Sequence, residues 1–65
     1  MKILVWEVRT SKGFTLMELS KKSGIGKSTI NNIENGKVSP TLFQIEIIAI
    51  ALGVNITDLF ESEYK

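Results

Sequence analysis

Apolar residues recur along the chain at helical spacing, and this pattern predicts an all-α fold. Glycines follow four of the apolar segments, at positions 13, 24, 36 and 53, where a helix commonly ends in the left-handed conformation. The expected helices span approximately residues 3–12, 15–22, 26–35, 41–52 and 55–60. Together they predict a compact five-helix bundle.

The two ends of the chain are the least regular parts of this pattern. The run Ile3–Trp6, followed by Val8, also suits a short β-strand, which is the alternative to the first helix. Near the other end, Ile56, Leu59 and Phe60 are expected to pack inward. Residues 61–65 are then expected to form a frayed tail.

Composition argues against most enzyme chemistry. The 65 residues include no His and no Cys, so the chain has no imidazole base, no thiolate nucleophile, no disulfide and none of the commonest zinc ligands. The carboxylates are scattered, and we expect no catalytic site, no metal and no cofactor. Residues 1–65 fit a single domain with no targeting or membrane-spanning segment, and the lack of disulfides favours the cytoplasm.

Charge is unevenly distributed although the net charge is only +1. Residues 1–40 contain seven basic and three acidic side chains, whereas residues 41–65 contain one basic and four acidic ones. A positive first part suggests an anionic partner for that part of the chain.

Residues 15–35 have the spacing of a helix-turn-helix motif. Thr15 as N-cap and Glu18 three residues later form a capping-box pattern, and Gly24 suits a tight turn. In this motif the second helix lies in the DNA major groove, so its exposed side chains should be short and polar. The polar side chains of this helix are Lys27, Ser28, Thr29, Asn31 and Asn32.

Two longer patterns occur at a fixed separation, Ile33-Glu34-Asn35-Gly36-Lys37 and Ala51-Leu52-Gly53-Val54. With these patterns, the stretch from about Val5 to Phe60 resembles the phage-repressor-like (XRE-type, Cro-like) helix-turn-helix domains. The resemblance implies a five-helix repressor-like bundle and a sequence-specific DNA-binding regulator.

The same resemblance implies roles for individual residues. The base-reading positions would be Lys27, Ser28 and Asn32, with Thr29 and Asn31 at the edge of the groove. The phosphate contacts would be Thr15, Asn35 and Lys37. Arg9 and Glu34 match a structural pair that ties the first helix to the end of the third.

The chain departs from the family pattern in the second helix. Leu16 stands where many relatives have a Gln that binds a backbone phosphate, so this contact is not expected here. Ser20 replaces a small Ala, and its hydroxyl is expected to bond to a preceding carbonyl.

The segment 41–52 is apolar on both sides. One face is the expected core, made of Leu42, Ile45, Ile48, Ala49 and Leu52. The opposite face carries a second apolar stripe, Phe43, Ile47 and Ile50, where the family usually has polar residues. We interpret this stripe as a homodimer interface, with Trp6, Ile3 or Leu4 as possible additions; the alternative is that the first helix or the tail with Tyr64 covers it within one chain.

Together these expectations predict a cytoplasmic transcriptional regulator, more specifically a repressor. It would bind a palindromic site on double-stranded DNA as a homodimer. No small-molecule ligand is expected, because so small a core leaves little room for one. The alternative is a protein-interaction module, such as an antitoxin or the partner of an anti-repressor. It would hold another protein against the stripe of Phe43, Ile47 and Ile50.

Overall fold

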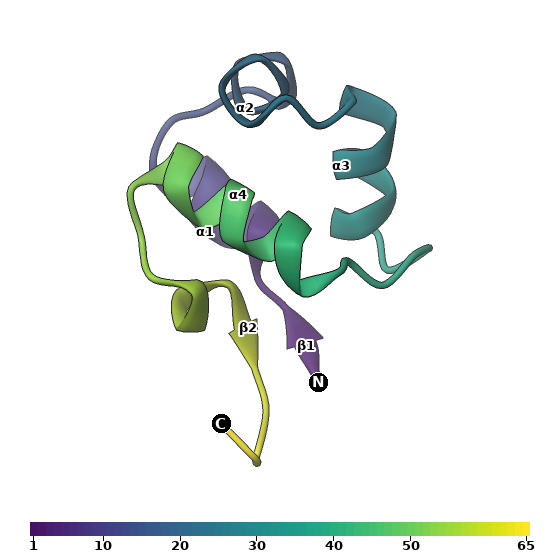
Figure 1. Cartoon of the computed structure of the whole chain (residues 1–65), viewed down its shortest axis with the longest axis vertical. Helices are drawn as coiled ribbons and strands as arrows, with labels where there is room; N and C mark the ends of the chain where they lie inside the picture. Colours follow the sequence, from purple (N-terminus) through teal and green to yellow (C-terminus); the bar gives the residue numbers. More distant parts are fainter.

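The computed structural model describes all 65 residues and contains four α-helices. In chain order they are α1 (Val5–Ser11), α2 (Leu16–Ser23), α3 (Lys27–Glu34) and α4 (Leu42–Leu52). In Figure 1, α4 crosses in front of α1, α2 is seen end-on above them, and α3 stands to one side. None of these helices is long and apolar enough to cross a membrane.

The prediction of five helices is wrong at both ends of the chain. The first helix begins at Val5 and not at Ile3, and the fifth is only a 3-10 turn, η1 (Ile56–Leu59). Beside these elements lie two short antiparallel strands, β1 (Lys2–Ile3) and β2 (Phe60–Glu61).

Main-chain pairing at this small sheet explains the change. Lys2 lies opposite Glu61, Ile3 lies opposite Phe60, and the N–H of Leu4 donates to the carbonyl of Leu59 over 2.8 Å. The β-favouring residues at the start of the chain thus find a partner strand. Glu61 is therefore not part of a frayed tail, and both ends of the chain lie together, away from α2 and α3 (Figure 1).

The core draws one or more side chains from every helix. Its nine buried apolar residues are Val5, Leu19, Ile30, Ile33, Ile45, Ile48, Ala49, Leu52 and Leu59. Two predicted core residues are exposed: Leu42, which is 84% exposed at the first position of α4, and Ile56 in η1. Leu42 is the first residue of α4 and precedes the part of the helix that packs on the core. Its side chain therefore remains in solvent.

Local interactions set both ends of α4, the longest helix. Thr41 caps α4, because its hydroxyl accepts the N–H of Gln44 while the Gln44 side chain accepts the N–H of Thr41, both over 3.0 Å. At the other end, Gly53 adopts a left-handed conformation with φ of 71°.

Candidate nucleic-acid interface

A three-residue turn, Gly24–Gly26, holds α2 and α3 in a fixed relation. Gly24 has φ of 75°, a conformation that other residues adopt only with strain. The Ser20 hydroxyl donates to the carbonyl of Ile25 over 2.7 Å, and the Ser23 hydroxyl accepts the N–H of Ile25 over 3.1 Å. Ser20 therefore bonds forward to the turn and not to a preceding carbonyl as expected, because the turn brings an unpaired carbonyl within its reach.

The outer face of α3 is polar. Ile30 and Ile33 bury the inner face completely. On the opposite side Ser28 and Asn31 are exposed and Asn32 is half-buried. These three side chains therefore present hydroxyl and amide groups to one surface, next to the exposed Lys27 at the start of the helix.

Thr29 occupies a different position from the other polar residues of α3. It is half-buried, and its hydroxyl lies 3.8 Å from where a Cβ on Gly26 would stand. At about 100° per residue, Thr29 lies closer to Ile33 than to Ser28 around the helix. Its side chain thus faces the turn more than the outer surface.

The beginning of α2 presents main-chain donors beside a carboxylate. Glu18 accepts the N–H of Thr15 over 2.8 Å, and the Thr15 hydroxyl accepts the N–H of Glu18 over 3.1 Å, as the capping-box pattern predicts. The N–H of Thr15 lowers the pKa of the Glu18 carboxyl, and the Thr15 side chain adds to this effect. The N–H groups of Leu16 and Met17, the first two helical residues, belong to the set that an α-helix leaves without intrahelical partners.

The end of α3 adds two further polar groups. Asn35 ends the helix, and its Nδ2 donates to the side-chain oxygen Oδ1 of Asn31 over 3.4 Å. Lys37 follows in the exposed turn after Gly36. Both residues thus follow the C-terminal end of α3, away from the turn that joins α3 to α2.

Arg9 anchors α1 to the end of α3. Its Nε donates to Oε2 of Glu34 over 2.6 Å, Nη2 donates to Oε1 over 3.1 Å, and Nη1 donates to the carbonyl of Phe14 over 2.8 Å. Both side chains of the pair are buried, with 9% and 3% of their surfaces exposed. This geometry agrees with the expected structural pair, and it leaves neither residue free to contact a ligand.

Comparisons with known proteins agree with this arrangement. The model of the helix-turn-helix family matches residues 7–59. The chain belongs to this family.

It is 39% identical over 61 residues to an HTH-type transcriptional regulator of Methanothermobacter thermautotrophicus, covering 92% of this chain and 88% of the relative. It is 30% identical over 60 residues to the HTH-type transcriptional regulator SinR of Bacillus subtilis, covering 91% of this chain and 54% of SinR. The chain thus spans about half the length of SinR.

Two solved structures share the fold. The restriction-modification controller protein C.AhdI from Aeromonas hydrophila aligns with a TM-score of 0.82 and 32% identity, over 86% of this chain and 85% of that one. The N-terminal DNA-binding domain of SinR aligns with a TM-score of 0.80 and 27% identity, over 94% and 90% of the two chains. The likeness includes the helix-turn-helix and the helices that support it.

A second surface of this helix-turn-helix domain is apolar. Phe43 is 67% exposed and Ile50 is 74% exposed, while Ile47 between them is half-buried. The chain leaves Phe43 and Ile50 uncovered, and Tyr64 in the tail is itself 92% exposed. The alternative that the first helix or the tail covers the whole stripe within one chain is therefore wrong.

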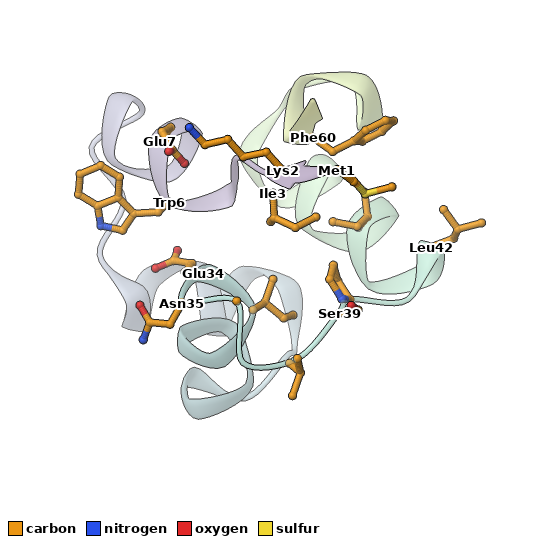
Figure 2. A pocket seen from close by; sticks show the side chains of 15 residues that line it. Met1, Lys2, Ile3, Trp6, Glu7, Glu34, Asn35, Ser39, Leu42 and Phe60 are labelled. Atoms are coloured by element: carbon orange, nitrogen blue, oxygen red, sulfur yellow. The ribbon is translucent and has the colours of Figure 1, made fainter. Parts of the chain in front are cut away.

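Trp6 lies apart from that stripe. It lines an open groove of about 900 Å³ between β1, α1, the end of α3 and the start of α4. Figure 2 shows Trp6 at one end of this groove, near Glu34 and Asn35, and Leu42 at the other end. The sequence did not predict this groove, because segments that are distant in the chain form it together.

The groove offers no set of groups suited to a metal ion. The chain contains no cluster of three or more His, Cys, Asp or Glu side chains that could hold one. The polar groups that line the groove include Glu34, which is already bound to Arg9. The polar surface of the helix-turn-helix is therefore the stronger candidate for a functional site.

Proposed function

We propose that this chain is a sequence-specific DNA-binding transcriptional regulator that reads the major groove with α3. The observation that carries the proposal is the polar outer face of Ser28, Asn31 and Asn32, fixed by a buttressed turn on a helix whose inner face is wholly buried. Membership of the helix-turn-helix family supports it, as does similarity to the DNA-binding domain of SinR.

The side chains suit the proposed roles. An Asn amide can pair with the N6 and N7 edge of adenine, a Lys can reach the guanine acceptors, and a Ser hydroxyl can bond to several bases. Asn32, Lys27 and Ser28 are the proposed base readers. Asn31 and Thr29 would contact the edge of the groove, Thr29 with less of its surface available.

Phosphate contacts would hold α3 in register. Lys37 and Asn35 are exposed beyond one end of the helix, and Thr15 is exposed at the start of α2. The N–H groups of Leu16 and Met17 could also meet a phosphate at this helix start. Glu18 lies at the same place and would repel it, so we assign the larger contribution to Lys37.

We further propose that two copies act together on a palindromic operator through the stripe of Phe43, Ile47 and Ile50. A dimer on a two-fold axis would present two copies of α3 to half-sites about one helical turn apart. A bound dimer occludes its own site, which favours repression. Since the relatives above come from bacteria and archaea, whose DNA lies in the cytoplasm, we place its action there.

Selection of bound duplexes from a randomised library at near-physiological salt tests this function. We expect an enriched inverted repeat. Asn32→Ala should relax the preference at one position in each half-site, whereas Thr57→Ala, an exposed change in η1 at the other end of the domain, should not. Failure to enrich any sequence with pure protein would contradict the proposal.

The same experiment separates DNA binding from the protein-interaction alternative. An antitoxin-like or anti-repressor-binding module would fail to enrich DNA while still exposing Phe43 and Ile50. The regulators and the controller protein named above support the DNA-binding role.

A further inference from the structure

We infer that two copies of this chain pack with their α4 helices antiparallel, so that Phe43 of one copy lies against the partner's Ile50. This inference rests on the proposed homodimer and specifies its geometry. It concerns the side of α4 on which Phe43 and Ile50 are exposed and Ile47 is half-buried.

The positions of four residues on α4 carry the argument. Phe43 and Ile50 are seven residues apart, or about two helical turns, and both are mostly exposed in nearly the same direction. Midway between them, Ile47 lies toward one edge of the stripe and the exposed Glu46 toward the other. The surface is therefore apolar at both ends and along one edge, with a single carboxylate on the opposite edge.

This pattern is self-complementary in an antiparallel arrangement. Consider a two-fold axis that runs between the two helices, perpendicular to α4 and level with the midpoint of positions 46 and 47. This axis exchanges the two ends of the stripe and keeps each edge on its own side. Phe43 then meets the partner's Ile50, and Ile47 meets the partner's Ile47. Glu46 and the partner's Glu46 share the remaining edge, where water reaches both.

A parallel arrangement is worse on two counts. It exchanges the edges, so that Ile47 would face the partner's Glu46 and a carboxylate would lose water without gaining a partner. It also aligns the two helix dipoles side by side in the same direction, whereas antiparallel dipoles attract each other. The stripe therefore specifies the direction of packing as well as the contact.

Size limits the strength of this association. A standard stable interface buries about 800 Å² per partner, which is roughly a fifth of the 4277 Å² surface of this domain. The stripe on one 11-residue helix covers less than that. We therefore expect a weak dimer in free solution that becomes complete on an operator, where both copies are held side by side.

Single-cysteine variants test the geometry, since the chain has no native Cys. Only a residue next to a two-fold axis can form a disulfide with its own copy, because the two Cα atoms must come within about 7 Å. Under mild oxidation, Ile47→Cys should give a covalent dimer by itself. Phe43→Cys and Ile50→Cys should each remain monomeric alone but give a covalent heterodimer when mixed. Thr57→Cys is the exposed control.

Three other outcomes would count against the antiparallel geometry or against the homodimer itself. Self-crosslinking of Phe43→Cys or of Ile50→Cys would indicate parallel helices and overturn the inference. A dimer by sedimentation that none of the three stripe variants crosslinks would place the interface elsewhere, which also overturns it. A protein that is monomeric by sedimentation with and without its operator would refute the homodimer itself, while selected DNA sites would still support DNA binding.

Glu46 provides an independent test that leaves the apolar stripe itself unchanged. Because the geometry brings two Glu46 carboxylates to the same edge, Glu46→Gln should strengthen dimerisation about two- to fivefold at low salt and less at high salt. The matched control is Glu63→Gln, which removes an exposed carboxylate from the tail. Weaker association of Glu46→Gln would contradict the antiparallel geometry, because it would mean that this carboxylate has a favourable partner across the interface.

Discussion

Arg9 of α1 and Glu34 of α3 form a bidentate ion pair, with 2.6 Å between Nε and Oε2, although they are 25 residues apart in the chain. The same guanidinium also donates to the carbonyl of Phe14, in the loop before α2. One side chain therefore connects α1, the entry to the helix-turn-helix and the end of the helix proposed to read DNA.

Removing one member of this pair should be severely destabilising. Glu34→Gln or Arg9→Met should each lower the free energy of unfolding by about 3–5 kcal/mol, because the remaining buried charge loses its partner. A 65-residue domain has roughly 3–10 kcal/mol in total, so either loss is a large fraction of its stability.

Urea unfolding followed by circular dichroism measures the effect. The double variant Arg9→Met/Glu34→Gln should lose less than the sum of the two single losses, since neither charge is left alone. Additive losses would show that the two residues stabilise the fold independently.

The turn of the helix-turn-helix offers a matched pair of glycine substitutions. Gly24→Ala should lower the free energy of unfolding by about 1–2 kcal/mol, because Gly24 has φ of 75° and alanine is strained there. The cost comes from the backbone alone, since an added Cβ would meet no atom within 4 Å.

Gly26→Ala is the control for that substitution. Gly26 has φ of −58°, and an added Cβ would make only an ordinary contact of 3.8 Å with the Thr29 hydroxyl. Alanine is a poorer N-cap than glycine but restricts the unfolded chain more, and these opposing effects should leave a change of less than about 0.5 kcal/mol in thermal or urea unfolding. Equal losses for both variants would refute the conformational explanation.

The capping box of α2 predicts a dependence of stability on acidity. Hydrogen bonds from Thr15 hold the pKa of Glu18 below its ordinary value, so the folded state favours the ionised carboxylate. The resulting stabilisation is present above the pKa of the unfolded chain, about 4.5, and is lost as the pH falls through the lower pKa of the folded state.

Glu18→Gln removes this contribution. Urea midpoints of the natural chain should therefore fall more steeply below about pH 4.5 than those of Glu18→Gln. Glu63→Gln, in the exposed tail, should retain the dependence of the natural chain. Parallel curves for the natural chain and Glu18→Gln would show that this carboxylate does not contribute to acid sensitivity.

Salt titrations of operator binding should separate phosphate contacts from base contacts. Lys37→Ala should weaken binding to all sequences alike and reduce the slope of log K against log salt by about 1, because one phosphate contact is lost. Asn32→Ala should cost about 1–3 kcal/mol on the preferred sequence while leaving the slope unchanged. An unchanged slope for Lys37→Ala would exclude the proposed phosphate contact.

Much of the helical part of this fold could be predicted from the sequence because its signals are local. The capping box of Thr15 and Glu18, the turn at Gly24 and the burial of Ile30 and Ile33 all depend on residues close together in the chain. The stripe of Phe43, Ile47 and Ile50 also follows from helical periodicity, and its exposed ends agree with the prediction.

The errors concern residues whose structure depends on distant partners. Ile3 suits either a helix or a strand, and its pairing with Phe60 decides the outcome. Leu42 has the periodicity of a core residue but precedes the packed part of α4. The groove beside Trp6 is formed by segments from both ends and from the middle of the chain, so no local pattern could indicate it.

The pairing of Lys2 with Glu61 also has a kinetic consequence. This contact closes a loop of nearly the whole chain, whereas the contacts within the helix-turn-helix are local. Because closing a longer loop costs more entropy, the small sheet should form after the main folding barrier has been crossed. Substitutions at this sheet should therefore accelerate unfolding and leave the folding rate nearly unchanged, so that the strands determine how long the domain stays folded and the helices determine how fast it folds.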